Sequence, residues 1–280
     1  MKVAVVTDST AYLPDGIADK HGIGVVPLHV VLGLHTGAEG VEVAPSQVAA
    51  ALTERRVSVS TSRPTPAEFA AVYRAAASQC IVSVHLSGAL SGTVDAARLA
   101  AEEVATDGVE VRVVDAGTIA MGLGFAVIAA AEAATGGADV DAVSSAASSA
   151  AAGTTTLFYV DTLEHLRRGG RIGAAAALVG TALAVKPLLH VVDGRIAPLE
   201  KVRTASKALA RLEDLAVGIA GDRPVDIAVH HLAAADKANS LAERLRTRVP
   251  GLQALHVSEV GAVVGAHVGP GLLGVVVSSR

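Results

Sequence analysis

Hydroxyl and glycine residues gather at three places where a predicted strand ends. Asp8 and Ser9 follow the apolar residues 3–6, residues 61–65 read Thr-Ser-Arg-Pro-Thr, and residues 87–93 read Ser-Gly-Ala-Leu-Ser-Gly-Thr. Helix starts carry free N–H groups and the positive end of the helix dipole, so such turns suit an anion. Because the carboxyl ends of parallel strands share one edge of a sheet, the three segments predict one anion-binding crevice. Each segment alone is better explained as an ordinary helix cap.

Motifs for nucleotide and hydrolase chemistry are missing from the sequence. No lysine follows a glycine, which excludes the P-loop motif. Residues 269–274 have the spacing of a dinucleotide fingerprint, but the six residues after them leave no room for the helix and strand it requires. No serine has glycine two residues before and after it, so Ser91 lacks the nucleophile elbow of hydrolases.

Histidine and cysteine do not form a recognisable metal site. Among the ten histidines there is no pair at i and i+4 accompanied by a candidate carboxylate, and the adjacent His230 and His231 would point to opposite faces of a strand. The single cysteine, Cys80, excludes a disulfide framework within the chain and suits a reducing compartment. The sequence therefore predicts no metal and no cofactor.

Short β-branched runs alternate with alanine-rich stretches, which is typical of strand–helix–strand units. Thr65, Pro66 and Glu68 form a capping box that predicts a helix start. In the first half we expect strands at residues 3–6, 24–32, 57–60, 80–86 and 109–114, with helices at 46–55, from 66, at 94–105 and at 119–134.

The second half predicts a different mixture of elements. Residues 139–153 are almost all Ala, Val and Ser, which fits a helix or a linker, and we place a domain boundary there. A second capping box begins at Asp161, and Asp193-Gly194 suits a type I′ hairpin turn. We expect strands at 155–160, 188–192, 195–201 and 225–230, helices at 204–217 and 233–246, and short valine-rich strands joined by a Gly-Pro-Gly turn within 260–279.

Composition limits the function classes further. The chain has 280 residues, 51% of them apolar but only 2% aromatic, and a net charge of −4, which disfavours a general nucleic-acid binder. Residues 260–279 carry no formal charge, yet their glycines divide the run into pieces better suited to a core than to a membrane span. The short apolar run after Lys2 does not resemble a signal peptide, so we expect a cytoplasmic soluble protein.

Six motifs, in this order, resemble the bacterial DegV family: residues 5–10, 61–64, 90–93, 169–172, 186–188 and 267–271. The resemblance covers nearly the whole chain. It implies an α/β fold of two domains, an N-terminal domain with a parallel sheet at residues 1–152 and a C-terminal domain with a mixed sheet and helices at 153–280.

The resemblance also implies a function. Family members of known role bind a long-chain fatty acid with its carboxylate between the domains, and present it to a separate ATP-dependent fatty acid kinase. The chain would then be a lipid-binding carrier and not an enzyme, with transient membrane contact when it exchanges lipid. By motif position, Thr61 and Ser91 would bind the carboxylate, His267 would close the site from the other domain, and four residues would shape it: Ser62, Gly92, Thr93 and Gly269.

A basic segment near residue 170 is a candidate for docking the kinase. Arg167, Arg168 and Arg171 cluster at the C-terminus of a short predicted helix, where the helix dipole alone would also explain them. Two other functions stay open at this point. One is an enzyme acting on a small carbonyl compound through Ser91 or His267, and the other is a sensor of a sugar or phosphate in the same crevice.

Overall fold

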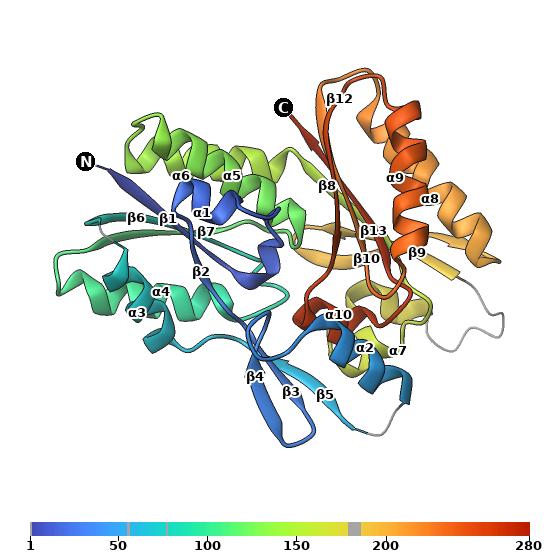
Figure 1. Ribbon diagram of the computed structural model, residues 1–280, viewed down its shortest axis with the longest axis horizontal. Helices are drawn as coiled ribbons and strands as arrows, with labels where there is room; N and C mark the ends of the chain where they lie inside the picture. Colours follow the sequence, from blue (N-terminus) through green and yellow to red (C-terminus); the bar gives the residue numbers. More distant parts are fainter. Residues whose placement is uncertain (1, 55–56, 77, 179–185) are drawn as a thin grey trace. The chain divides into compact units, whose positions relative to one another are not determined.

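The computed structural model describes residues 2–54, 57–76, 78–178 and 186–280 (Figure 1). Contacts between Cα atoms divide the chain into two compact units. The first comprises Met1–His29 and Ser62–Gly153, and the second comprises Val30–Thr61 and Thr154–Arg280. The chain therefore enters the second unit twice, a feature that the sequence did not predict. The division into an N-terminal domain at residues 1–152 and a C-terminal domain at 153–280 stays a prediction.

The first unit is built on a sheet of four parallel strands in the order β2-β1-β6-β7. Helices α3 and α4 cover one face, and α5 and α6 cover the other (Figure 1). Its elements are β1 (Val3–Asp8), the 3₁₀ turn η1 (Ser9–Ala11), α1 (Ile17–His21), β2 (Gly24–Val26), α3 (Pro66–Ala75), β6 (Cys80–His85), α4 (Thr93–Ala105), β7 (Glu110–Asp115), α5 (Met121–Thr135) and α6 (Val140–Ala152).

Alternation along β1 explains why both faces are covered. Val3 and Val5 pack into the core beneath α5 and α6, whereas Val6 packs into the core beneath α3 and α4. Successive side chains of a strand point to opposite faces, so a strand that is apolar at consecutive positions needs helices on both sides.

Two helix starts of the first unit follow from local sequence chemistry. The Thr65 hydroxyl accepts from the backbone N–H of Glu68, and the Glu68 carboxylate accepts from that of Thr65, which confirms the predicted capping box. Asp139 caps α6 by accepting from Ala142 N, so the segment read as helix or linker is a helix.

The second unit contains a six-stranded mixed sheet in the order β10-β9-β8-β13-β11-β12, in which only β11 and β12 pair in parallel. Helices α8 and α9 pack on this sheet (Figure 1). Its elements are β8 (Thr154–Tyr159), α7 (Glu164–Arg168), the 3₁₀ turn η2 (Gly173–Leu178), β9 (Lys186–Val192), β10 (Arg195–Val202), α8 (Ala205–Ala220), β11 (Val225–His231), α9 (Ala235–Arg248), β12 (Leu252–Glu259), α10 (Ala262–Val268) and β13 (Leu273–Ser279).

The earlier stretch of the second unit forms its own small sheet in the order β4-β3-β5, together with α2, which contacts α10. These elements are β3 (His29–Leu32), β4 (His35–Ala38), α2 (Pro45–Glu54) and β5 (Val59–Ser62). A parallel sheet, a mixed sheet and accompanying helices confirm the predicted fold class. Asp193 and Gly194 have φ values of 48° and 71°, as the predicted type I′ turn between β9 and β10 requires.

Three local predictions were wrong. Residues 24–32 form two strands in different sheets, because Pro27, which has no N–H to donate, separates β2 from β3. The residue preceding α7 is Leu163 and not Asp161, since the Asp161 carboxylate accepts from the Tyr159 hydroxyl at 2.5 Å.

The third error concerns residues 260–279. Their first half is the helix α10 and not a strand, so His267 lies in the last turn of a helix. The buried carboxylate of Glu39 accepts from Val263 N at 2.7 Å and so caps this helix through a partner distant in sequence. Within the described residues, no helix has both the length and the apolar character needed to cross a membrane.

Candidate functional site

Thr61 and His267 form a hydrogen-bonded pair in the second unit. Thr61 Oγ1 lies 2.8 Å from His267 Nε2, and 206 residues separate the two in sequence. Thr61 comes from β5, and His267 from the last turn of α10. Besides supplying Thr61, residues 30–61 hold the helix of His267 in place, because Glu39 caps α10 and Val48 of α2 lies near Gly265.

Two glycines allow this part of the second unit to pack closely. A Cβ atom on Gly169 would overlap the His267 ring at Nδ1, and one on Gly269 would overlap the His165 ring. Gly269 also has a φ of 76°, which side chains other than glycine rarely adopt. The close approach explains why glycine stands at both positions, and it adds His165, which the sequence gave no reason to select.

His267 is held as a neutral ring. Burial lowers its pKa to about 4, and the positive charge of Arg171 acts in the same direction. The Arg171 guanidinium is oriented by a hydrogen bond from Nη1 to Gly169 O at 2.6 Å. At neutral pH the imidazole therefore offers one N–H donor and one lone pair.

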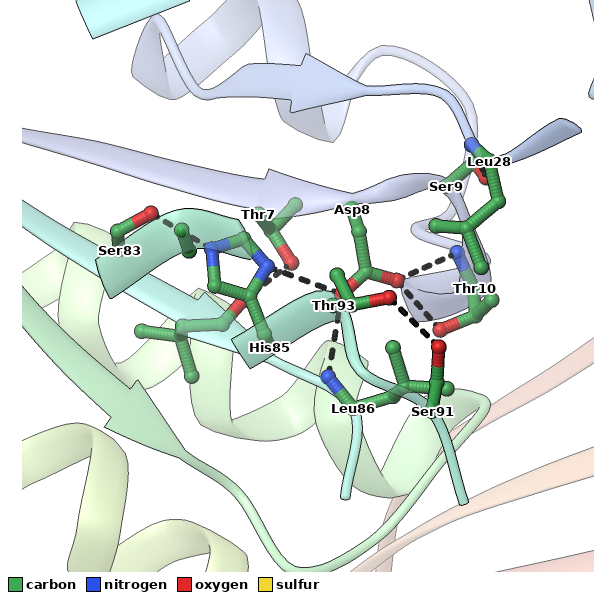
Figure 2. Close-up of polar contacts among 12 residues, drawn as sticks. Thr7, Asp8, Ser9, Thr10, Leu28, Ser83, His85, Leu86, Ser91 and Thr93 are labelled. Atoms are coloured by element: carbon green, nitrogen blue, oxygen red, sulfur yellow. Dashed lines mark hydrogen bonds and ion pairs between the residues drawn. The ribbon is translucent and has the colours of Figure 1, made fainter. Parts of the chain in front are cut away.

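Ser91 and Thr93 form the matching pair in the first unit. Their hydroxyl oxygens lie 2.8 Å apart at the start of α4, and Thr93 is completely buried (Figure 2). The turn before them is held by a hydrogen bond from Ser91 N to Ser87 O at 3.1 Å. Arg63 Nη1 donates to Gly92 O at 3.3 Å, and a Cβ atom on Gly92 would overlap this guanidinium.

Asp8 anchors the strand ends of the first unit (Figure 2). Its fully buried carboxylate accepts from Thr10 N at 3.0 Å and from the Thr10 hydroxyl at 2.5 Å through one oxygen. The other oxygen accepts from Leu86 N at 3.1 Å and pairs with His85 Nδ1 at 3.0 Å. Asp8 thus joins the end of β1 to the start of the turn that carries Ser91.

A hydrogen-bonded chain continues from His85 into the core. His85 Nε2 lies 2.6 Å from the Ser83 hydroxyl, which accepts from the Tyr73 hydroxyl at 2.8 Å. All three side chains are buried, and burial raises the pKa of Tyr73. The sequence prediction missed His85, although Ser83 and His85 stand two residues apart on a strand and therefore share one face.

The expectation that all three hydroxyl segments follow strands of one parallel sheet was wrong for residues 61–65. Thr61 and the exposed Ser62 end β5, which belongs to the three-stranded sheet and not to the parallel sheet that ends at Asp8. Thr61, His267 and Gly269 lie in the second unit, whereas Ser62, Ser91, Gly92 and Thr93 lie in the first.

The arginines proposed for docking differ from one another. Arg167 and Arg168 are 52% and 64% exposed, and both pair with the Glu164 carboxylate, at 2.9 Å and 2.7 Å. The hydrogen bond from Arg167 is the main cause that lowers the pKa of Glu164 to about 2. Arg171 is partly buried instead, and its guanidinium donates a hydrogen bond to Gly169 O. In the part of the chain that the structure describes, no group of three His, Cys, Asp or Glu residues is arranged to hold a metal ion.

Comparisons with known proteins agree along the whole chain. A family model described as uncharacterised protein, DegV family, matches residues 2–280. A DegV domain-containing protein of Streptomyces coelicolor is 63% identical over 281 residues, covering 99% of each chain. Protein DegV of Bacillus subtilis is 34% identical over 283 residues, covering 98% of each.

Two solved structures are also closely similar. A DegV family protein from Thermus thermophilus, described in terms of fatty acid binding, has a TM-score of 0.93 at 33% identity, with 100% of both chains covered. DegV of Bacillus subtilis, described as a fatty acid binding protein, has a TM-score of 0.90 at 32% identity, again with 100% of both chains covered.

Proposed function

Because the chain belongs to the DegV family, we propose that it binds a long-chain fatty acid and holds the carboxylate through the hydroxyls of Thr61 and Ser91. The observation that carries this proposal is that each hydroxyl has a second polar side chain at 2.8 Å: His267 for Thr61, and Thr93 for Ser91. The fatty acid binding described for the Thermus and Bacillus proteins supports it.

The head group decides whether such a protein can take its ligand from a membrane. Burying an acyl chain gains about 0.8 kcal/mol per methylene, or on the order of 10 kcal/mol for about sixteen carbons. A lipid bilayer offers nearly the same gain. Charge-assisted hydrogen bonds of roughly 1.5 to 3 kcal/mol each can therefore favour the protein, if hydroxyl donors face the carboxylate.

The remaining site residues have supporting roles in this proposal. Thr93 and Gly92 shape the turn of Ser91, since Thr93 bonds the Ser91 hydroxyl and Gly92 leaves room for Arg63. Gly269 allows the chain after α10 to lie against His165. Ser62 is exposed next to Thr61 and supplies a further hydroxyl.

We further propose that the chain is a carrier whose bound carboxylate is phosphorylated by a separate ATP-dependent kinase. In that reaction a carboxylate oxygen attacks the γ-phosphorus of ATP and ADP leaves, so the carrier holds the nucleophile and contributes no nucleotide site. The exposed Arg167 and Arg168 are the docking candidates. A cytoplasmic location and transient contact with a membrane, where fatty acids are exchanged, complete this proposal.

Native mass spectrometry of the purified full chain tests the ligand class. We expect a bound species that is heavier by the mass of one long-chain fatty acid and is lost on delipidation, then restored by added palmitate. A delipidated, folded protein that takes up no fatty acid of about twelve to twenty carbons would contradict the proposal, because the apolar gain rises with chain length. Uptake of a small sugar phosphate or carbonyl compound instead would favour the sensor or enzyme functions.

A further inference from the structure

Arg63 is an exposed cation of the first unit that the proposed function leaves without a role. It lies between β5 and α3, and its Nη1 donates to Gly92 O at 3.3 Å. An added Cβ on Gly92 would overlap Nη1 and lie only 3.1 Å from Cδ and Cζ, so the guanidinium packs directly on the glycine. Because Gly92 separates Ser91 from Thr93 in the chain, the cation stands beside the turn that carries both hydroxyls.

No carboxylate neutralises Arg63 in the part of the chain that the structure describes. Gly92 O is its only hydrogen-bond partner among those residues, and none of them forms an ion pair with it. Asp95 is the acidic residue in the first turn of α4, and it pairs with Arg98 at 3.6 Å. A guanidinium presents several N–H donors in a planar fork, so most of the donors of Arg63 remain available to an external acceptor.

The position of Arg63 does not help to stabilise α4. A helix N-terminus is the positive end of the helix dipole, so an acidic side chain is favourable there and a cation is unfavourable. Gly92 is the N-cap of α4 and offers no side-chain cap. A structural role would therefore place an acid here, whereas a guanidinium beside two hydroxyls suits an anion that comes from outside the chain.

The charge of the head group distinguishes the substrate of the proposed kinase reaction from its product. A carboxylate carries a single negative charge, whereas a phosphoryl group carries about 1.5 to 2 at pH 7 and presents more acceptor oxygens. Under the proposed function the hydroxyls of Thr61 and Ser91 already serve the carboxylate, so an added phosphoryl group needs donors of its own. The planar fork of an arginine matches phosphate oxygens with parallel hydrogen bonds.

We propose that Arg63 is a specificity-determining residue that binds the phosphoryl group of the acyl phosphate, so that the carrier holds this product more tightly than the fatty acid. This inference rests on the proposed function. Gly92 belongs to the same subsite, because its missing side chain sets the position of the guanidinium. Tighter binding of the product shifts the equilibrium of phosphorylation on the carrier toward acyl phosphate by the ratio of the two affinities.

Titration of the full chain with palmitate and with hexadecyl phosphate tests this role. Hexadecyl phosphate is stable to hydrolysis, has the same chain length, and is doubly charged at about pH 8. At low salt we expect Arg63→Gln to weaken hexadecyl phosphate binding about tenfold, and palmitate binding less than about threefold. High salt should reduce this difference, because it screens an exposed charge. Equal weakening of both ligands, or no weakening of either, would overturn the proposal.

Two further variants separate the position of the guanidinium from its charge. Gly92→Ala keeps the charge but displaces the guanidinium, and the φ of −75° at this residue suits alanine. We expect the same selective loss of hexadecyl phosphate binding as in Arg63→Gln, and full affinity would contradict the proposal. Arg98→Gln removes another exposed arginine near the start of α4 and should leave both affinities unchanged. A tenfold loss in this control would mean that net charge alone sets the affinity.

The outcomes distinguish this inference from the proposed function. A wild-type protein that binds neither ligand would contradict the fatty acid proposal and, with it, the role of Arg63. Palmitate binding with the same ratio of affinities in the wild type and in Arg63→Gln would leave the fatty acid proposal in place and overturn the role of Arg63 alone.

Discussion

The same local arrangement, a hydroxyl next to a second polar side chain, is supported differently in the two units. In the first unit, Ser91 and Thr93 follow a turn whose start is fixed by Asp8, a carboxylate that accepts hydrogen bonds from two strand ends. In the second unit, His267 leaves Nδ1 without a partner among the described residues and is held by the close packing of Gly169. Hydrogen bonds to Asp8 therefore hold the first pair in position, whereas close packing against Gly169 holds the second.

The largest expected effect on stability comes from removing the Asp8 carboxylate, which holds the strand ends of the first unit together. Asp8→Ala removes a buried acceptor that serves Thr10, His85 and Leu86. We expect it to lower the free energy of unfolding by about 3 to 5 kcal/mol, since the donors are left buried and unpaired. Urea denaturation measures the loss.

The control for Asp8 is Asp107→Ala, which removes an exposed carboxylate paired with Arg74. A surface ion pair of this kind contributes little to stability because solvent screens it, so this variant should unfold nearly as the wild type does. Equal losses of unfolding free energy in the two variants would mean that the buried hydrogen bonds of Asp8 stabilise the fold no more than an exposed ion pair does.

Removing the two hydroxyls should affect ligand binding more than folding. We expect Thr61→Val and Ser91→Ala each to weaken fatty acid binding by roughly 1 to 3 kcal/mol, because under the proposed function each removes one bond to the carboxylate. Neither residue occupies a helix N-cap position, so the melting temperature should change little. Calorimetric titration and thermal melts of the same samples check this, and a lower melting temperature with unchanged affinity would assign the hydroxyls to structure alone.

Acidification should destabilise the second unit through His230. Burial lowers its folded-state pKa to about 4, below the unfolded value near 6.5, so the unfolded state takes up more protons between these two values. Stability is therefore complete above about pH 6.5 and falls by about 2 kcal/mol per such histidine on reaching pH 5. Urea denaturation from pH 7 to pH 5 should show a smaller decline for His230→Gln, and an identical decline would contradict the assignment.

A single methyl group should disrupt the packing of Gly169 against His267. Gly169→Ala places a Cβ against His267, so we expect palmitate affinity to fall by about 1 kcal/mol, comparable to the loss of one hydrogen bond. Gly218→Ala is the matched control, because a Cβ in that helix meets nothing within 4 Å. It should raise stability by about 0.5 to 1 kcal/mol with affinity unchanged. Unaltered affinity in Gly169→Ala would remove Gly169 from the site.

The smallest expected effect concerns the exposed arginines. Under the proposed carrier function, charge reversal in Arg167→Glu should slow acyl phosphate formation by the proposed kinase a few-fold at low salt and less at high salt, with palmitate affinity intact. Rates that do not depend on salt would argue against electrostatic docking.

Local chemistry made much of the fold predictable from the sequence. The capping box of Thr65 and Glu68 and the turn at Asp193 depend on neighbouring residues only, so both could be predicted. The helix α10 could not, because its cap is Glu39, 224 residues away. Pro27 was a visible signal for the break between β2 and β3 that the apolar run around it obscured.

The candidate site shows the same limit. The resemblance named Thr61 and His267, but their contact depends on residues 30–61 joining the second unit, which no local pattern encodes. His165 and Gly169 depend on the packing of rings against backbone, and this cannot be derived from residue types alone.

The most direct test of the central claim compares palmitate with hexadecanol, which has the same chain length but no carboxylate. If two hydroxyl donors face the carboxylate, palmitate should bind the wild-type protein at least about tenfold more tightly than the alcohol. Thr61→Val and Ser91→Ala should each narrow this ratio by weakening palmitate alone. Equal binding of palmitate and hexadecanol by the wild-type protein would contradict the account.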